Sequence, residues 1–239
     1  MGWLSRRSSA SRAPSLPSPS PPLDVRNAEL LSLAAKGDEH GVARLLDGHA
    51  DLHAAGEFGR SPLHEAAIHG REGVVRLLLA RNARIQAKCR NGYSALHEAA
   101  VNGRLGTIAL LLESDADVRA RNIYGSLPLH EAAVNGHAGA VEMLLNAKSD
   151  IQAKSTNGYS SLHRAAYLGH VHAVELLLRA KADVHAEDDV RAHMRLPMHS
   201  CQRLLIFVHW HRAICLVKRV DPAASYLAAY VFKALGTKR

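Results

Sequence analysis

The sequence predicts an all-α repeat solenoid, in which helix-turn-helix units stack side by side and β-hairpin loops connect them. The first observation is that the phrase SPLHEAAIHG at residues 61–70 is followed at intervals of 33 residues by three variants of it, SALHEAAVNG, LPLHEAAVNG and SSLHRAAYLG. The second is that each copy is followed by a second apolar stripe with helical spacing. The third is that only 5% of the residues are aromatic, so the core must consist of the small aliphatic side chains that suit closely stacked helices.

Each unit begins with a turn and a first helix. A glycine stands at the fourth position, where a tight turn needs a positive φ, and a capping serine follows in three units, whereas Leu127 replaces it in the unit at 122–154. Paired alanines then allow neighbouring helices to approach closely, and a glycine ends the helix. The turn glycines are Gly59, Gly92, Gly125 and Gly158, and the helix-ending glycines are Gly70, Gly103, Gly136 and Gly169.

The second helix and a short extended piece complete each unit. In the unit at 56–88 the apolar stripe is Val75, Leu78 and Leu79, and the later units repeat this spacing. We predict a repeat domain over residues 26–188, with an atypical first repeat at 26–55 whose first helix starts at Asn27. The full repeats are 56–88, 89–121, 122–154 and 155–187.

The recurring histidines raise the question of a metal site. His64, Glu65 and His69 resemble the zinc-binding pattern of a metalloprotease helix, but that pattern needs histidines four residues apart. His64 and His69 are five apart, which points them about 140° away from each other. We therefore predict a structural role for the histidine that recurs in each unit, namely His64, His97, His130 and His163.

The rest of the sequence offers no pattern for chemistry. It has no phosphate-binding glycine loop, no CxxC pair and no nucleophile whose partners follow from spacing. We predict a non-enzyme with no catalytic residues, no metal ligands, no cofactor and no small-molecule substrate. Three cysteines without a CxxC pair or a secretory signal favour a reducing compartment, so we expect a cytoplasmic protein, with a nuclear location left open.

The repeated phrases S-P-L-H, S-A-L-H, L-P-L-H and S-S-L-H, all in register, resemble the T-P-L-H-x-A-A-x-x-G motif of the ankyrin-repeat family. The resemblance implies a curved stack of antiparallel helix pairs, in which the motif histidine bonds neighbouring repeats together. One departure follows each second helix, where the family has glycine. His49, Lys148 and Lys181 stand there in three units, and each should cost on the order of 1 kcal/mol in the left-handed conformation.

By the same resemblance, the hairpin tips and the exposed side of the first helices form a concave surface that binds another protein. The candidate residues on the tips are Phe58, Arg60, Arg90, Asn91, Tyr93, Tyr124 and Tyr159, and those on the first helices are Glu98, Glu131 and Tyr167. Tyr93, Tyr124 and Tyr159 should project as one ladder, although stacking of Tyr93 and Tyr159 on neighbouring hairpins is an alternative. An acidic stripe of Glu65, Glu98 and Glu131 that ends in Arg164 would suit a basic or polar segment, and a solvated face explains it equally well.

The two ends of the chain differ from the repeats. Residues 1–25 are rich in Ser, Pro and Arg and are predicted to be disordered; an organelle-targeting role stays open, although five prolines between positions 14 and 22 disfavour the helix it needs. Residues 189–239 are predicted to form a basic helical tail, which either caps the stack or binds a partner.

Charge placement supports an alternative function. Lys and Arg outnumber Asp and Glu by 3 to 0 in residues 1–23 and by 9 to 2 in residues 189–239, but they number 18 against 20 in residues 24–188. The ends could therefore associate with nucleic acid or an acidic membrane, which we consider less favoured than a protein partner. We expect a monomer that acts as a scaffold or adaptor.

Overall fold

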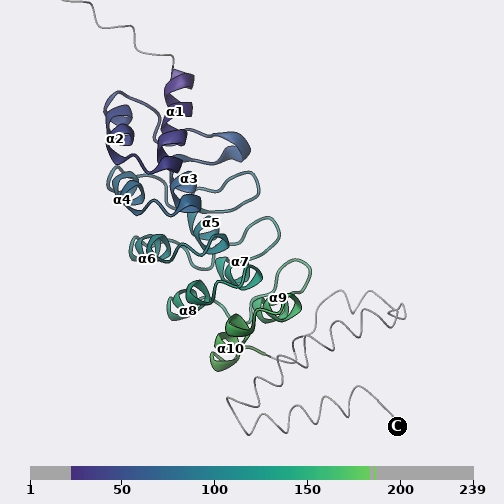
Figure 1. Cartoon of the computed structure of the whole chain (residues 1–239). Helices are drawn as coiled ribbons and strands as arrows, with labels where there is room; N and C mark the ends of the chain where they lie inside the picture. Colours follow the sequence, from purple (N-terminus) through teal and green to yellow (C-terminus); the bar gives the residue numbers. More distant parts are fainter. Residues whose placement is uncertain (1–22, 184–185, 187–239) are drawn as a thin grey trace, which may run out of the picture.

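The computed structural model describes residues 23–183 and residue 186, and within this part ten α-helices stack in pairs (Figure 1). The first helices of the pairs are α1 (Leu23–Lys36), α3 (Pro62–His69), α5 (Ala95–Val101), α7 (Pro128–Val134) and α9 (Ser161–Leu168). The second helices are α2 (Glu39–Asp47), α4 (Glu72–Ala80), α6 (Leu105–Glu113), α8 (Ala138–Asn146) and α10 (Val171–Arg179). The predicted disordered segment and the predicted basic tail lie outside the described residues, except for Leu23 to Val25.

The helices form two layers. Each first helix contacts the next first helix, and each second helix contacts the next second helix, from one end of the stack to the other. The loops between pairs project from the side of the first helices, which we call the loop side (Figure 1). Aliphatic residues fill the space between the layers, and Leu78, Leu111 and Leu144 are fully buried at equivalent positions. The all-α repeat stack predicted from the 33-residue period is confirmed.

Local sequence explains where the first helices start and stop. Ser94 and Ser160 accept hydrogen bonds from the backbone N–H three residues later, as N-caps do. Gly70 and Gly169 end α3 and α9 with φ of 69° and 76°, which a residue with a Cβ adopts only with strain. Leu127 offers no hydroxyl, and the neighbouring Ser126 side chain is buried without a hydrogen bond of good geometry in the described part of the chain.

The backbone adopts a left-handed conformation after each second helix, at a position where this sequence has no glycine. His49, Lys148 and Lys181 have φ of 64°, 62° and 65°. Asn82 and Asp115 adopt the same conformation, which their short polar side chains tolerate better. The stack therefore forms despite local backbone strain at three of these five turns.

Two expectations need correction. Helix α1 begins at Leu23 and not at Asn27, because the residues before Asn27 include Asp24, whose carboxylate suits the first turn of a helix. The predicted β-hairpins contain no strand within the described residues, where one isolated antiparallel bridge joins Lys154 to Ser160. The reason is that each loop is closed by a few hydrogen bonds around its tip, such as Cys89 N–H to Tyr93 O at 2.9 Å.

A second repeated contact, which was not predicted from the sequence, joins neighbouring pairs. A basic residue follows each helix-ending glycine and donates to a carbonyl of the preceding pair: Arg71 Nε to Ala35 O (2.9 Å), Arg104 Nε to Ile68 O (3.1 Å), His137 Nε2 to Val101 O (2.9 Å) and His170 Nε2 to Val134 O (2.8 Å). These side chains lie within 3 Å of a Cβ built on the glycine one repeat earlier, so only glycine fits there. The sequence contained a signal for this contact, because Arg or His directly follows each of the helix-ending glycines Gly70, Gly103, Gly136 and Gly169.

Candidate partner-binding surface

The motif histidines form one row through the stack, which we call the histidine row (His64, His97, His130 and His163). In the first three, Nε2 lies 3.0–3.2 Å from a backbone carbonyl of the following loop. A carbonyl only accepts, so Nε2 carries the proton and Nδ1 is the acceptor. Nδ1 accepts the N-cap backbone N–H in all four, at 3.2–3.3 Å. For His163, no hydrogen bond joins Nε2 to a backbone carbonyl within the described residues.

This arrangement leaves the buried histidines neither basic nor free to bind a metal. Burial lowers the pKa of both His97 and His130 to about 4, so both are neutral at pH 7. Burial also lowers the pKa of His64. Because both ring nitrogens of these three residues are occupied, they act as cross-links between repeats.

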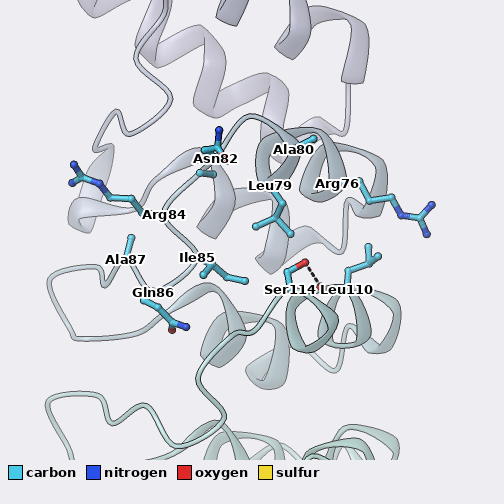
Figure 2. A pocket seen from close by; sticks show the side chains of 11 residues that line it. Arg76, Leu79, Ala80, Asn82, Arg84, Ile85, Gln86, Ala87, Leu110 and Ser114 are labelled. Carbon is cyan, nitrogen blue, oxygen red and sulfur yellow. Dashed lines mark hydrogen bonds between the residues drawn. The ribbon is translucent and has the colours of Figure 1, made fainter.

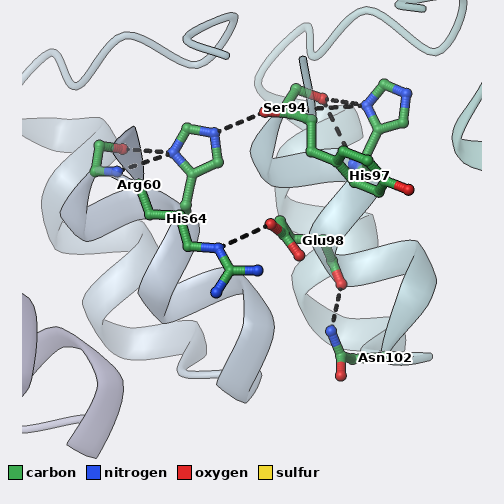
Figure 3. A network of polar contacts seen from close by, with 8 residues as sticks. Arg60, His64, Ser94, His97, Glu98 and Asn102 are labelled. Carbon is green, nitrogen blue, oxygen red and sulfur yellow. Dashed lines mark hydrogen bonds and ion pairs between the residues drawn. The ribbon is translucent and has the colours of Figure 1, made fainter. Parts of the chain in front are cut away.

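The two glutamates predicted to line the surface are in fact buried. Glu98 is 5% exposed and Glu131 is 7% exposed, and burial raises the pKa of each carboxyl group. Glu98 Oε1 accepts from Arg60 Nε at 3.1 Å, across one repeat (Figure 3). Glu131 Oε1 accepts from Asn122 Nδ2, also at 3.1 Å. The expected exposed acidic stripe is therefore wrong, because both of these inner carboxylates (Glu98 and Glu131) are buried, Glu98 paired with Arg60 of the preceding repeat and Glu131 with Asn122 of its own repeat.

The prediction that three tyrosines project from the stack as one ladder is also wrong. The ring of Tyr93 lies 5.5 Å from that of His97, and Tyr159 lies 6.3 Å from His163, so both tyrosines pack on the histidine row of their own repeat. Burial and the nearby Glu131 carboxylate raise the pKa of the Tyr93 hydroxyl. Tyr124 instead stands directly before its turn glycine and is 52% exposed.

The tips of successive loops are joined directly by backbone hydrogen bonds. Arg90 N–H donates to Phe58 O (2.9 Å), Ile123 N–H to Asn91 O (3.2 Å), and Thr156 N–H to Tyr124 O (2.9 Å). These six residues, which we call the tip edge, are all exposed: Phe58, Arg90, Asn91, Ile123, Tyr124 and Thr156. Ile123 and Thr156 are not among the residues predicted from the sequence, although the repeat register places them next to the tip residues.

The tip edge exposes large apolar side chains. Phe58 is 50% exposed and Ile123 is 57% exposed. Phe58 has φ 59° and ψ 13°, a left-handed conformation that its counterparts Asn91 and Tyr124 do not adopt. An exposed aromatic residue held in a strained backbone is typical of functional positions. The Arg60 guanidinium lies 5.8 Å from the centre of the Phe58 ring, a cation–π contact.

Tyr167 belongs to the loop side but lies apart from the tip edge. It is 72% exposed on α9, in the last described pair, where no later described helix covers it. Arg164 on the same helix lies 6.0 Å from the centre of the Tyr159 ring. Of the predicted candidates, the structure thus brings Phe58, Arg90, Asn91 and Tyr124 onto the tip edge, and the others lie elsewhere.

An open groove of about 920 Å³ lies on the other layer, where α4 and the loop after it meet α6 (Figure 2). Leu79, Ile85 and Leu110 give it an apolar wall, flanked by Arg76 and Arg84. The one hydroxyl in its lining, that of Ser114, donates to Leu110 O at 2.8 Å. The lining contains no carboxylate, histidine or cysteine that could act as an acid, base or nucleophile.

Within residues 23–183, no group of three or more His, Cys, Asp or Glu side chains is placed to hold a metal ion. None of the helices in this part combines the length and apolar character that a membrane-spanning helix needs.

Comparison with known protein families identifies the class of protein. The family described as "Ankyrin repeats (3 copies)" matches residues 30–122 and 120–188, which together span more than half of the chain. The chain therefore belongs to the ankyrin-repeat family. A search of curated proteins found no match. Ankyrin repeats are generally protein–protein interaction modules and are typically non-catalytic.

Proposed function

We propose that this protein is a scaffold or adaptor that binds a partner protein through the loop side of its repeat stack. The observation that carries the proposal is the tip edge, where Phe58, Ile123 and Tyr124 are each at least half exposed along one hydrogen-bonded row. Aromatic anchors near the centre of an interface supply most of its binding energy. By family resemblance the surface continues onto the concave face of the first helices.

The repeat domain would supply the binding surface without doing chemistry. His64, His97 and His130 are occupied by cross-links and the inner carboxylates are paired, so these groups support the fold and are not free to act as an acid or a base. The partner would therefore be held and positioned, as a scaffold requires.

Affinity capture with full-length protein, followed by mass spectrometry, tests the proposal. The informative variant is Phe58→Ala with Tyr124→Ala, and the matched control is Leu105→Ala, which removes an exposed apolar side chain (44% exposed) from the second-helix layer. Partners captured by the wild type and by the control, but lost with the double variant, support the proposal. Equal capture by all three proteins contradicts it.

A second comparison addresses the alternative of association through the basic ends. A fragment of residues 24–188 lacks most of the excess positive charge. If binding depends on the ends, it should vanish in this fragment and fall steeply with salt in the full chain. Binding that survives in the fragment supports the loop side instead.

A further inference from the structure

The loop tips are positively charged, although the repeat region as a whole is not. The tip segments 55–60, 88–93, 121–126 and 154–159 contain five cationic side chains and one carboxylate, that of Glu57. The five cations are Arg60, Lys88, Arg90, Arg121 and Lys154. Residues 24–188 in contrast contain 18 Lys and Arg against 20 Asp and Glu. The tips therefore create a local positive potential on a stack of slightly negative charge.

Backbone carbonyls, which do not cancel charge, hold two of these cations in place. Lys88 Nζ donates to Arg121 O at 2.9 Å, and Arg121 Nη1 donates to the carbonyls of Gly125 and Lys154 at 2.7 and 2.8 Å. Among the described residues, no carboxylate lies within ion-pairing distance of Lys88, Arg90 or Arg121. The charge of these three side chains is thus available to a ligand, whereas Arg60 is paired with Glu98.

Apolar and cationic side chains alternate from one tip segment to the next. Phe58 on the first tip is followed by Lys88 and Arg90 on the second, by Ile123 and Tyr124 on the third, and by Lys154 on the fourth. Neighbouring helices pack about 8–10 Å apart, so the two apolar positions lie roughly 16–20 Å apart. An extended peptide advances about 3.3 Å per residue and covers this distance in about five or six residues.

We propose that the tip edge recognises an extended, acidic protein segment that carries two apolar residues about five or six positions apart. The apolar residues would contact Phe58 and the Ile123–Tyr124 pair, and acidic residues between them would lie over Lys88 and Arg90. This inference rests on the proposed function and adds the chemistry of the partner. It reverses the charge expected from the sequence, because the glutamates that favoured a basic segment are buried.

A protein segment fits the surface better than a nucleic acid does. Ile123, at 57% exposed, has no ring on which a base could stack, and an aliphatic side chain of the partner would cover it instead. Glu57 beside Phe58 would repel a continuous phosphate backbone but tolerates a peptide whose charges are spaced.

Peptide display on the full-length protein tests the proposal. A library of random 16-residue peptides is selected against the wild-type chain, and the affinity of enriched peptides is measured by fluorescence anisotropy. We expect net-negative peptides with apolar residues five or six positions apart. Arg90→Glu with Arg121→Glu should weaken them at least tenfold. Arg44→Glu with Arg76→Glu, which reverses two exposed charges on the second helices, should change their affinity less than twofold.

The outcomes separate this inference from the proposed function. Enriched peptides that are neutral or basic, yet lose binding in Phe58→Ala with Tyr124→Ala, overturn the acidic partner and keep the binding surface. Peptides that bind all tip variants equally overturn the binding surface itself. A single-stranded oligonucleotide that binds as tightly as the peptides, and is lost in the Arg90 and Arg121 variant, overturns the choice of a protein segment. If the charge-reversed variant fails to fold, the wild-type protein is tested with altered peptides instead. Replacing the glutamates of a selected peptide with glutamine must then weaken its binding.

Discussion

The first helices and the loop tips alternate along the chain, yet they differ in which side chains they bury. On the first helices, polar groups are inside: His97 and His130 are 0% exposed, and Glu98 and Glu131 are nearly so. On the tips, the large apolar side chains of Phe58, Ile123 and Tyr124 are outside. A buried polar group needs a partner, and in a repeat stack the neighbouring unit supplies it. The difference indicates that the buried polar groups of the first helices, which we call the inner side, stabilise the fold. The loop tips are then free to serve binding.

The largest expected effect on stability comes from the leucines buried between the two layers of helices. Leu111 and Leu144 are 0% exposed in interior pairs, so replacing either with alanine should lower the free energy of unfolding by about 2–5 kcal/mol. Leu45, in the first pair, is 9% exposed, and its helix contacts only one neighbour in its layer. Leu45→Ala should therefore cost less. Urea denaturation of the three variants measures this, and a larger loss at Leu45 would mean that the stability of the stack is not concentrated in its interior.

Acidification should lower the free energy of unfolding through the buried histidines of the first helices. The ordinary pKa of histidine is 6.5, and burial lowers that of His97 and His130 to about 4. As the pH falls below 6.5 the unfolded chain takes up protons that the folded chain does not, so stability present above pH 6.5 is lost on the way to pH 4. At pH 5 the loss should be about 2 kcal/mol per histidine.

The inner carboxylates oppose this trend. Burial raises the pKa of Glu98 and Glu131, so their contribution is largest at low pH and is lost as the pH rises through the raised pKa. Urea denaturation at pH 7.5, 6 and 5 should still show a net loss on acidification, and His97→Gln should show a smaller loss than the wild type. A stability that rises from pH 7.5 to pH 5 would contradict neutral burial of the histidine row.

A smaller effect should come from the capping residues of the first helices. Ser126 Oγ is buried without a hydrogen bond of good geometry in the described part of the chain. It lies close enough to the Glu131 carboxyl group to lower its pKa, against the larger rise that burial causes, so Ser126→Ala should change stability by less than about 1 kcal/mol. Ser94 Oγ lies 2.9 Å from His97 Nδ1, so Ser94→Ala should lower stability by about 1 kcal/mol. Thermal denaturation of the two serine variants compares the two effects. If Ser126→Ala lowers stability as much as Ser94→Ala does, the contact between the Ser126 hydroxyl and Glu131 is a full hydrogen bond.

The 33-residue period was sufficient to predict the stack, and the resemblance to ankyrin repeats implied the histidine cross-links and the left-handed turns, because these features depend on residues that recur from unit to unit. The repeat pattern could not predict that Glu98 is paired inside the stack, because its partner Arg60 is 38 residues away and does not recur. A single glutamate on a helix gives no sign of whether the next repeat covers it.

The tyrosines show a different limit. Tyr93 and Tyr159 share one repeat position, whereas Tyr124 lies two positions earlier in its unit. The intervals of 31 and 35 residues already departed from 33, so the register contained the signal that the three side chains are not equivalent. The sequence could not show which position packs on the histidine and which reaches solvent.

Paired alanine substitutions at Tyr93 and Tyr124 test the separation of fold and binding most directly. The free energy of unfolding and the affinity for a captured partner or selected peptide are measured on both variants. Tyr93→Ala should lower stability by about 1–3 kcal/mol and leave the affinity of the folded fraction nearly unchanged, because its ring packs on His97. Tyr124→Ala should change stability by less than about 0.5 kcal/mol and weaken binding by about 1 kcal/mol or more. If Tyr124→Ala unfolds the stack while Tyr93→Ala remains stable and loses binding, the assignment of the inner side to folding and the tip edge to recognition is wrong.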